Sequence, residues 1–175
     1  MKSYQRVATR YMKAKYQKGN ITIEVVTDEE DIVGVELRVD GEYKGHCEAH
    51  VGFYDLDDLY RGFACADDIE KLSKERWFEE EMFRYDDDGY PVILVVEITN
   101  SYLHEDLHGQ RCGIQMYVEV VKEAFFEHGR LPLLFMPNYC HNRSTSDKAL
   151  RVWKSFARKY HSEGDVIVID KTPYL

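Results

Sequence analysis

Residues 97–117 read EITNSYLHEDLHGQRCGIQMY, and the rest of the chain is organised around them. Just upstream, residues 91–98 (PVILVVEI) are almost continuously aliphatic and β-branched, which predicts a strand buried on both faces. Downstream, Met116, Val120 and Ala124 recur at helical spacing. A loop between such a strand and such a helix directs several backbone N–H groups, and the positive end of the helix dipole, at one point. The stretch therefore predicts a strand, a phosphate-binding loop and a helix.

The loop resembles the cofactor motif of the GNAT superfamily, the acyl-CoA-dependent N-acyltransferases, which reads Gln/Arg-x-x-Gly-x-Gly/Ala between a strand and a helix. Residues 103–113 (LHEDLHGQRCG) lie without a gap over the family pattern Val-His-Pro-Asp-Tyr-Arg-Gly-Lys-Gly-Ile-Gly, and Met116-Tyr117 lie over its Leu-Tyr. His108 stands where the motif has Gln or Arg, and Arg111 stands where it has its first glycine. Because glycine lets the backbone approach a pyrophosphate closely, Arg111 either strains the loop or offers its guanidinium to the phosphate.

A second register of the motif is also open. Residues 110–115 (QRCGIQ) keep the Gln and the first Gly but lose the last Gly. Both registers put the pyrophosphate on the amides of residues 109–115. The resemblance implies that acetyl-CoA is the co-substrate and that it binds to Leu103, His108, Gly109, Gln110, Arg111, Cys112, Gly113, Ile114, Ser146, Ala149 and Trp153.

The last three of these residues come from a second segment that is similar to the family. Residues 146–153 (SDKALRVW) resemble the Asn-x-x-Ala-x-x-x-Tyr pattern of the next GNAT helix, with Ser146 as its N-cap and Ala149 as the small residue beside the pantetheine arm. Trp153 takes the position of the family's acidic tyrosine, and an indole N–H is not a useful acid at neutral pH. The spacing does not distinguish among the substitutes Tyr102, Tyr117, Tyr139 and Tyr160.

Glu97 is the predicted general base. It lies eleven residues before His108, the spacing at which histone-acetylating members of the superfamily carry their base glutamate. The resemblance implies that Glu97 takes the proton of the amine through a water, and that a backbone N–H near Leu103 polarises the thioester. The alternative is a strand glutamate on a solvated face, since an ionisable group among Val95, Val96 and Ile98 needs a reason to be there.

Length and charge limit the function classes. The 175 residues predict one domain, residues 1–175, which is long enough to bury a core. The net charge of −9 argues against a general nucleic-acid binder and favours an amine-bearing small molecule or protein as substrate. A homodimer stays open as an assembly. The four cysteines form no C-x-x-C pair, so neither a zinc site nor a disulfide framework is predicted.

The compartment is predicted from what the chain lacks. No apolar run approaches the roughly 20 residues of a membrane span. The first ten residues, MKSYQRVATR, have no apolar core of a signal peptide. We therefore expect a cytoplasmic protein that is not bound to membranes.

The remaining elements predict an α+β fold with α/β character, in which a mixed, mostly antiparallel GNAT-like sheet is flanked by helices. Asp40-Gly41 is the strongest hairpin signal, and the apolar run of residues 131–136 closes a βαβ unit in parallel with residues 92–98. A helix between the third and fourth strands departs from the usual family order. We expect helices at residues 1–19, 66–83, 116–128 and 146–153, and strands at residues 21–26, 32–39, 43–53, 91–98, 131–136 and 165–169.

Other chemistries are weaker hypotheses. His46 and His50 would share one strand face without a third metal ligand, and His104, Glu105, Asp106 and His108 belong to the loop already explained. Residues 86–88 lack the spacing of a calcium loop, and Cys140, His141 and Asn142 are adjacent, so they cannot form a triad locally. Two functions therefore remain: an N-acetyltransferase that acts on an amine, and a catalytically silent GNAT-fold module that binds acyl-CoA or another protein.

Overall fold

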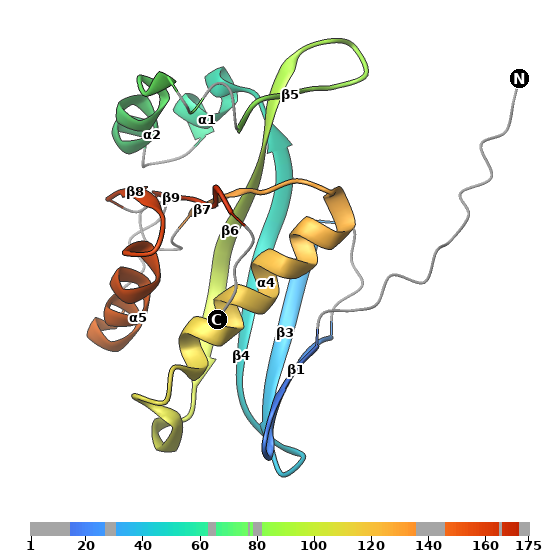
Figure 1. Cartoon of the computed structure of the whole chain (residues 1–175), viewed down its shortest axis with the longest axis vertical. Coiled ribbons are helices and arrows are strands. Elements are labelled where there is room, and N and C mark those ends of the chain that lie inside the picture. Colours follow the sequence, from blue (N-terminus) through green and yellow to red (C-terminus); the bar gives the residue numbers. More distant parts are fainter. Residues whose placement is uncertain are drawn as a thin grey trace, which may run out of the picture.

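The computed structural model describes residues 15–26, 31–62, 66–76, 78, 82–135, 146–164 and 166–171. In these residues the chain has a mixed α+β fold, with an open, mostly antiparallel sheet of nine strands flanked by four α-helices (Figure 1). The strands are β1 Lys15–Lys18, β2 Ile21–Val25, β3 Ile32–Val39, β4 Glu42–Tyr54, β5 Arg84–Tyr85, β6 Pro91–Leu103, β7 Leu133–Phe135, β8 His161–Glu163 and β9 Val166–Val168. The helices are α1 Leu56–Gly62, α2 Ala66–Ser73, α4 Cys112–His128 and α5 Asp147–Ala157, with a 3-10 turn, η1, at Glu105–Leu107.

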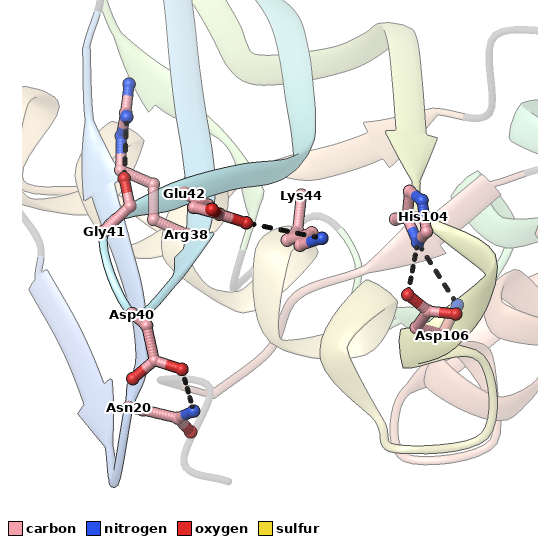
Figure 2. Close-up of polar contacts among 8 residues, drawn as sticks. All are labelled: Asn20, Arg38, Asp40, Gly41, Glu42, Lys44, His104 and Asp106. Carbon is pink, nitrogen blue, oxygen red and sulfur yellow. Dashed lines mark hydrogen bonds and ion pairs between the residues drawn. The ribbon is translucent and has the colours of Figure 1, made fainter.

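The strands follow the order β1-β2-β3-β4-β6-β7-β9-β8, with β5 beside β6. Asp40 (φ 52°) and Gly41 (φ 84°) both adopt positive φ in the β3–β4 turn, which confirms the predicted hairpin. The Asp40 carboxylate also accepts a hydrogen bond from Asn20 Nδ2 at 2.8 Å, which ties this turn to the β1–β2 turn (Figure 2).

The helix predicted for residues 1–19 is wrong where the structure describes it. Residues 15–18 form strand β1 instead, and residues 1–14 lie outside the described part. Gly19 has a φ of 61° in the turn that pairs β1 back onto β2, and Lys15 forms an ion pair with Glu24 at 2.7 Å. Glycine followed by asparagine is itself a hairpin signal, and here it outweighs the helical spacing of the apolar residues before it.

The core lies on both faces of the sheet. Val96 and Ile98 belong to the cluster beneath α4 and α5, whereas Ile93 and Val95 belong to the cluster beneath α1 and α2. Since successive strand side chains alternate between faces, the two pairs of helices cover opposite faces. Figure 1 shows α4 running diagonally across β3, β4 and β6.

The central unit is a βαβ arrangement in which β6 and β7 are parallel, as predicted. Their pairing is short, because β7 meets β6 only from Val95 to Glu97. From there to Leu103, β6 pairs with β4 alone, and its register shifts at Thr99, which makes a bulge. In the described residues, one side of the second half of β6 therefore has no neighbouring strand.

Two further predictions need correction. The helix expected over residues 66–83 breaks after Ser73, and α1 and β8 were not predicted. β5 was not predicted either, and β6 extends to Leu103, past its predicted end at residue 98. Glu119, which lies among the apolar positions of α4 in the sequence, is only 1% exposed, with its carboxylate accepting from Gln115 at 2.8 Å and Lys122 at 3.0 Å. The remaining elements agree with prediction within a few residues at their ends. No helix in the described ranges combines the length and apolar character needed to cross a membrane.

Candidate functional site

The loop between β6 and α4 has an unusual backbone at two of its residues. Gly109 has a φ of 80°, and Arg111 has a φ of 63° and a ψ of 7°, so both are left-handed. A left-handed conformation costs a residue with a Cβ about 1–2 kcal/mol. Arg111 was expected either to strain the loop or to offer its guanidinium to the phosphate. Its left-handed conformation shows that the strain is present.

The N-terminus of α4 is open. Arg111 is its N-cap residue but makes no side-chain capping bond, and the first turn holds no acidic residue. The N–H groups that begin a helix have no acceptor within the helix, so those of Cys112, Gly113 and Ile114 are available to a ligand. The helix dipole adds partial positive charge at the same point.

The start of the loop is anchored by His104. Its N–H donates to the Lys44 carbonyl at 2.8 Å, and its Nδ1 lies 3.4 Å from the Asp106 N–H and 3.1 Å from the Asp106 carboxylate (Figure 2). These contacts hold η1 in place. In the described residues no group of three or more His, Cys, Asp or Glu side chains could hold a metal ion.

Two adjoining cavities border the loop. We call the first, of about 530 Å³, the α4 cavity; it is lined by Leu103, Leu107, His108, Gly109, Arg111, Cys112, Gly113, Ile114, Lys148, Arg151, Val152 and Ser155. We call the second, of about 240 Å³, the β6 cavity; it is lined by Ser101, Tyr102, Leu103, His108, Gly113, Met116, Tyr117, Ser146, Lys148, Ala149 and Val152. The residues common to both show that the two cavities are neighbours between β6, α4 and α5.

The α4 cavity is cationic in an acidic protein. Arg111, Lys148 and Arg151 line it, and its described lining includes no carboxylate, although the chain carries a net charge of −9. Lys148, Arg151, Val152 and Ser155 recur at the spacing of one helix face, so this face of α5 is turned to the cavity. Sequence reasoning missed Lys148 and Arg151, although that spacing is visible in the sequence.

His108 connects β6 to α5 within this site. Its Nε2 lies 3.1 Å from the Leu103 carbonyl oxygen, and its Nδ1 lies 3.3 Å from Lys148 Nζ. A carbonyl can only accept, so Nε2 carries the ring proton and Nδ1 accepts from the Lys148 ammonium. The ring thus holds Lys148 at the boundary of the two cavities.

The backbone of β6 opens toward the cavities. His104 N–H donates to β4, and N–H groups alternate between the two sides of an antiparallel strand, so the N–H and C=O of Leu103 point away from β4. The bond from His108 to the Leu103 carbonyl agrees with this direction. In the described residues no strand occupies that side, so the Leu103 N–H can donate to a ligand.

Tyr117 is the buried phenol of the β6 cavity. Its hydroxyl hydrogen-bonds to Ser101, and burial, followed by the charge of Cys47, raises its pKa well above the ordinary value. Tyr117 therefore stays protonated at neutral pH and is a hydrogen-bond donor. Tyr102 also lines this cavity but is exposed, and Tyr139 lies outside the described residues.

Glu97 lies on the other face of the sheet. It pairs with His50 of β4 and Phe135 of β7, and its neighbours Val96 and Ile98 point toward α4. Burial and then the charge of Glu97 raise the pKa of Tyr54, which puts the carboxylate near that phenol. Glu97 is half-buried and lines neither cavity.

Most of the predicted cofactor residues meet around the two cavities. Ser146 caps α5 by accepting from the Ala149 N–H at 3.2 Å, as predicted. Gln110 lines a separate cavity, and its side chain donates to the Asp106 carbonyl. Trp153 lines neither cavity, because it is 1% exposed in the core, where its ring lies edge-on to Tyr117 at 6.1 Å.

The Cys140, His141 and Asn142 cluster lies outside the described residues, so the hydrolase hypothesis gains nothing from this geometry. What the described residues bring together is an open helix N-terminus, three cationic side chains and a free strand edge. Comparison of the chain with protein-family models, with curated proteins and with solved structures gave no match.

Proposed function

We propose that this chain is a GNAT-type N-acetyltransferase that transfers the acetyl group of acetyl-CoA to an amine. The observation that carries the proposal is the convergence of the uncapped α4 N-terminus and a cationic cavity with the unpaired edge of β6. The first two features suit a pyrophosphate, and the third suits a thioester carbonyl.

The phosphates bind in the α4 cavity. The N–H groups of Cys112, Gly113 and Ile114 donate to the pyrophosphate oxygens, with Lys148 and Arg151 as counter-charges from α5. Because α4 and α5 both contribute to binding the pyrophosphate, the site does not depend on a glycine at position 111, and the loop tolerates Arg111 there. The pantetheine arm then runs into the β6 cavity past Ala149, whose small side chain leaves room.

The thioester lies at the open edge of β6. The Leu103 N–H polarises its carbonyl, and the amine nitrogen attacks the carbonyl carbon as the carbon–sulfur bond breaks. Tyr117 donates a hydrogen bond to the leaving sulfur. Full proton transfer from Tyr117 is unfavourable, because its raised pKa lies above the roughly 8.5 of a thiol, so CoA leaves as a thiolate.

The amine approaches from the face that carries Glu97. The helices α4 and α5 cover the other face of the sheet beside the unpaired edge of β6. The acceptor therefore reaches this edge from the side opposite to the cofactor. Glu97 lies six residues before Leu103 on this strand, about 20 Å along it, so it takes the proton of the amine through a chain of waters and not through a single one.

Isothermal titration with acetyl-CoA tests the cofactor premise before any acceptor is known. Saturable binding, and a melting temperature that rises with acetyl-CoA concentration, are expected. An absence of both at millimolar acetyl-CoA overturns the proposal. Release of CoA is then measured with a panel of small amines and basic proteins.

Glu97→Gln tests the base. The substitution keeps the size of the side chain but removes its basicity, so turnover should fall by about 10²–10⁴-fold while acetyl-CoA affinity stays within about twofold. Steady-state rates at saturating acceptor across neutral pH provide the measurement. An unchanged rate removes Glu97 from the mechanism.

Tyr117→Phe tests the donor. The variant keeps the ring that packs against Trp153 but loses the hydroxyl, so turnover should fall by about tenfold, the value of one hydrogen bond to a developing charge. Tyr160→Phe is the matched control, because this phenol also has a raised pKa, of about 12, but lines neither cavity. Equal effects of the two substitutions would argue against a role for Tyr117.

A second function is favoured by Trp153. Its indole N–H is buried without a hydrogen-bond partner, so the residue at the family's acid position supplies no proton. The protein would then bind acyl-CoA without turnover. Acetyl-CoA that binds tightly yet stays intact across the whole acceptor panel would support this function against the transferase.

A further inference from the structure

A separate cavity of about 480 Å³ lies at the far end of β6, between the start of α1 and the β5–β6 hairpin. We call it the α1–β5 cavity; its lining is Asp55, Leu56, Asp57, Phe83, Tyr85, Tyr90 and Pro91. Its volume falls within the roughly 300–1,000 Å³ of small-ligand sites. None of these residues belongs to the proposed transferase site.

The lining combines aromatic rings with carboxylates. Phe83, Tyr85 and Tyr90 supply three aromatic rings, and Asp55 and Asp57 supply negative charge. An anion would meet repulsion here, and a neutral apolar ligand would leave the carboxylates unused. An organic cation satisfies both, because ring faces and carboxylates each attract positive charge.

One ring and the backbone that carries the other two are held in place. Phe83 packs edge-on against the buried Phe78 at 6.1 Å, which anchors it to the core. In the hairpin turn, the Asp86 carboxylate accepts from the Asp88 N–H at 3.0 Å and from the Tyr90 N–H at 2.7 Å. The turn therefore sets the separation of Tyr85 and Tyr90, which flank it.

These tyrosines are nevertheless open to a ligand, since Tyr85 is 70% and Tyr90 is 65% exposed. No lysine or arginine is among the described lining residues. The neighbouring Arg84 does not line the cavity; its guanidinium donates to the Phe83 carbonyl at 2.6 Å and keeps its positive charge, which the two lining carboxylates outnumber. Asp55 is fixed by accepting from the Asp58 N–H at 2.7 Å, so its carboxylate is positioned before a ligand arrives.

We propose that the α1–β5 cavity binds an organic ammonium ion, with an alkylated ammonium group against Phe83, Tyr85 and Tyr90 and its charge facing Asp55 and Asp57. This site is independent of acetyl-CoA. Its failure would leave the transferase proposal intact, and the reverse also holds.

Titration of the full chain with choline at constant ionic strength tests the site, followed by amide NMR shifts. Saturable shifts should be confined to residues 55–57 and 83–90. The neutral isostere 3,3-dimethylbutan-1-ol has the same shape without the charge, and should bind at least about tenfold more weakly. Equal binding of the two, or no saturable shift with choline, overturns the proposal.

The choline affinity of single-residue variants distinguishes binding in this cavity from general attraction of choline to an acidic protein. Tyr90→Ala should weaken choline binding by about tenfold, and Asp57→Asn by a smaller factor. Tyr43→Ala is the matched control, because this tyrosine is also exposed but lines none of the cavities described here. Unchanged melting curves verify the fold of each variant, and a Tyr90→Ala variant that binds choline with unaltered affinity refutes the assignment.

Two further probes identify the ligand's source. Nε-trimethyllysine that binds more tightly than choline indicates a modified peptide, and the opposite order indicates a free small molecule; both orders support the proposal. Calcium chloride in place of choline checks the carboxylates alone. Shifts with calcium and none with either ammonium probe would overturn it.

Discussion

The N-terminus of α4 differs from those of α1, α2 and α5. The first turns of α1 and α2 each contain two aspartates, and α5 begins at Ser146, whose hydroxyl accepts from Ala149 N–H, with Asp147 next. α4 begins at the left-handed Arg111 with neither a side-chain cap nor an acid. Three helices therefore satisfy their N-terminal charge from their own sequence, and the helix that borders the two cavities does not.

This difference has an energetic size. A side-chain cap contributes about 1 kcal/mol, and a first-turn acid about 0.3–1 kcal/mol. The left-handed Arg111 adds a cost of about 1 kcal/mol. The fold tolerates this loss of stabilising free energy because α4 is buried along Cys112 to Val121. An anionic ligand at the N-terminus of α4 would offset the loss.

Gly113→Asp should produce the largest effect, because it gives α4 the acid that the other helices have. The carboxylate would occupy the anion position and repel the phosphates, so acetyl-CoA affinity should fall by more than about a hundredfold. Titration calorimetry measures the loss. A carboxylate there that leaves the affinity within about threefold would mean that the α4 N-terminus does not bind the cofactor.

Gly113→Ala separates packing from charge in this prediction. A Cβ at position 113 would lie 3.2 Å from both methyl carbons of Val152, so α5 must shift slightly even without added charge. We expect an intermediate loss of affinity. Gly62→Asp is the matched control, since nothing lies within 4 Å of a Cβ there and no residue of α1 lines the α4 or the β6 cavity.

The sequence was most informative where local chemistry has few solutions. Asp40-Gly41 specified a turn, Ser146 specified a helix start, and Gly129, with a φ of 66°, ends α4 where predicted. The loop at residues 108–113 was located for the same reason, since two glycines between a buried strand and a helix permit few backbone paths. The family resemblance itself stays a prediction.

Tertiary contacts decided what the sequence could not. Glu119 carries an ionisable side chain, but α4 is covered nearly all round, and Gln115 and Lys122 compensate its burial. Trp153 matched a cofactor position by spacing, yet it packs into the core, and the face of α5 turned to the cavity is the one with Lys148 and Arg151. Helical spacing gives the faces of a helix but not which face meets a cavity.

Lys148→Glu should have a smaller effect than the substitution at Gly113. It reverses one of the cations of the α4 cavity and breaks the contact with His108, so acetyl-CoA affinity should fall by about tenfold, and the salt dependence of binding should weaken.

Lys154→Glu makes the same charge change on the same helix at an exposed residue that lines neither cavity, and should leave affinity within about twofold. Titrations of both variants at two salt concentrations compare them. Equal losses would show that only the net charge of the protein matters, and that α5 contributes no specific counter-charge.

Arg111→Gly should have the smallest effect and should change stability and binding in opposite directions. Glycine relieves the left-handed strain of about 1 kcal/mol, but its greater freedom in the unfolded chain offsets about half of this, so the free energy of unfolding should rise by about 0.5 kcal/mol. The same change removes one cation from the α4 cavity and should weaken acetyl-CoA binding by about threefold. Thermal melts with and without acetyl-CoA measure both quantities on one sample. A variant that binds acetyl-CoA more tightly would mean that the guanidinium obstructs the phosphates, and that the α4 N-terminus alone, like the glycine loop it resembles, provides the anion site.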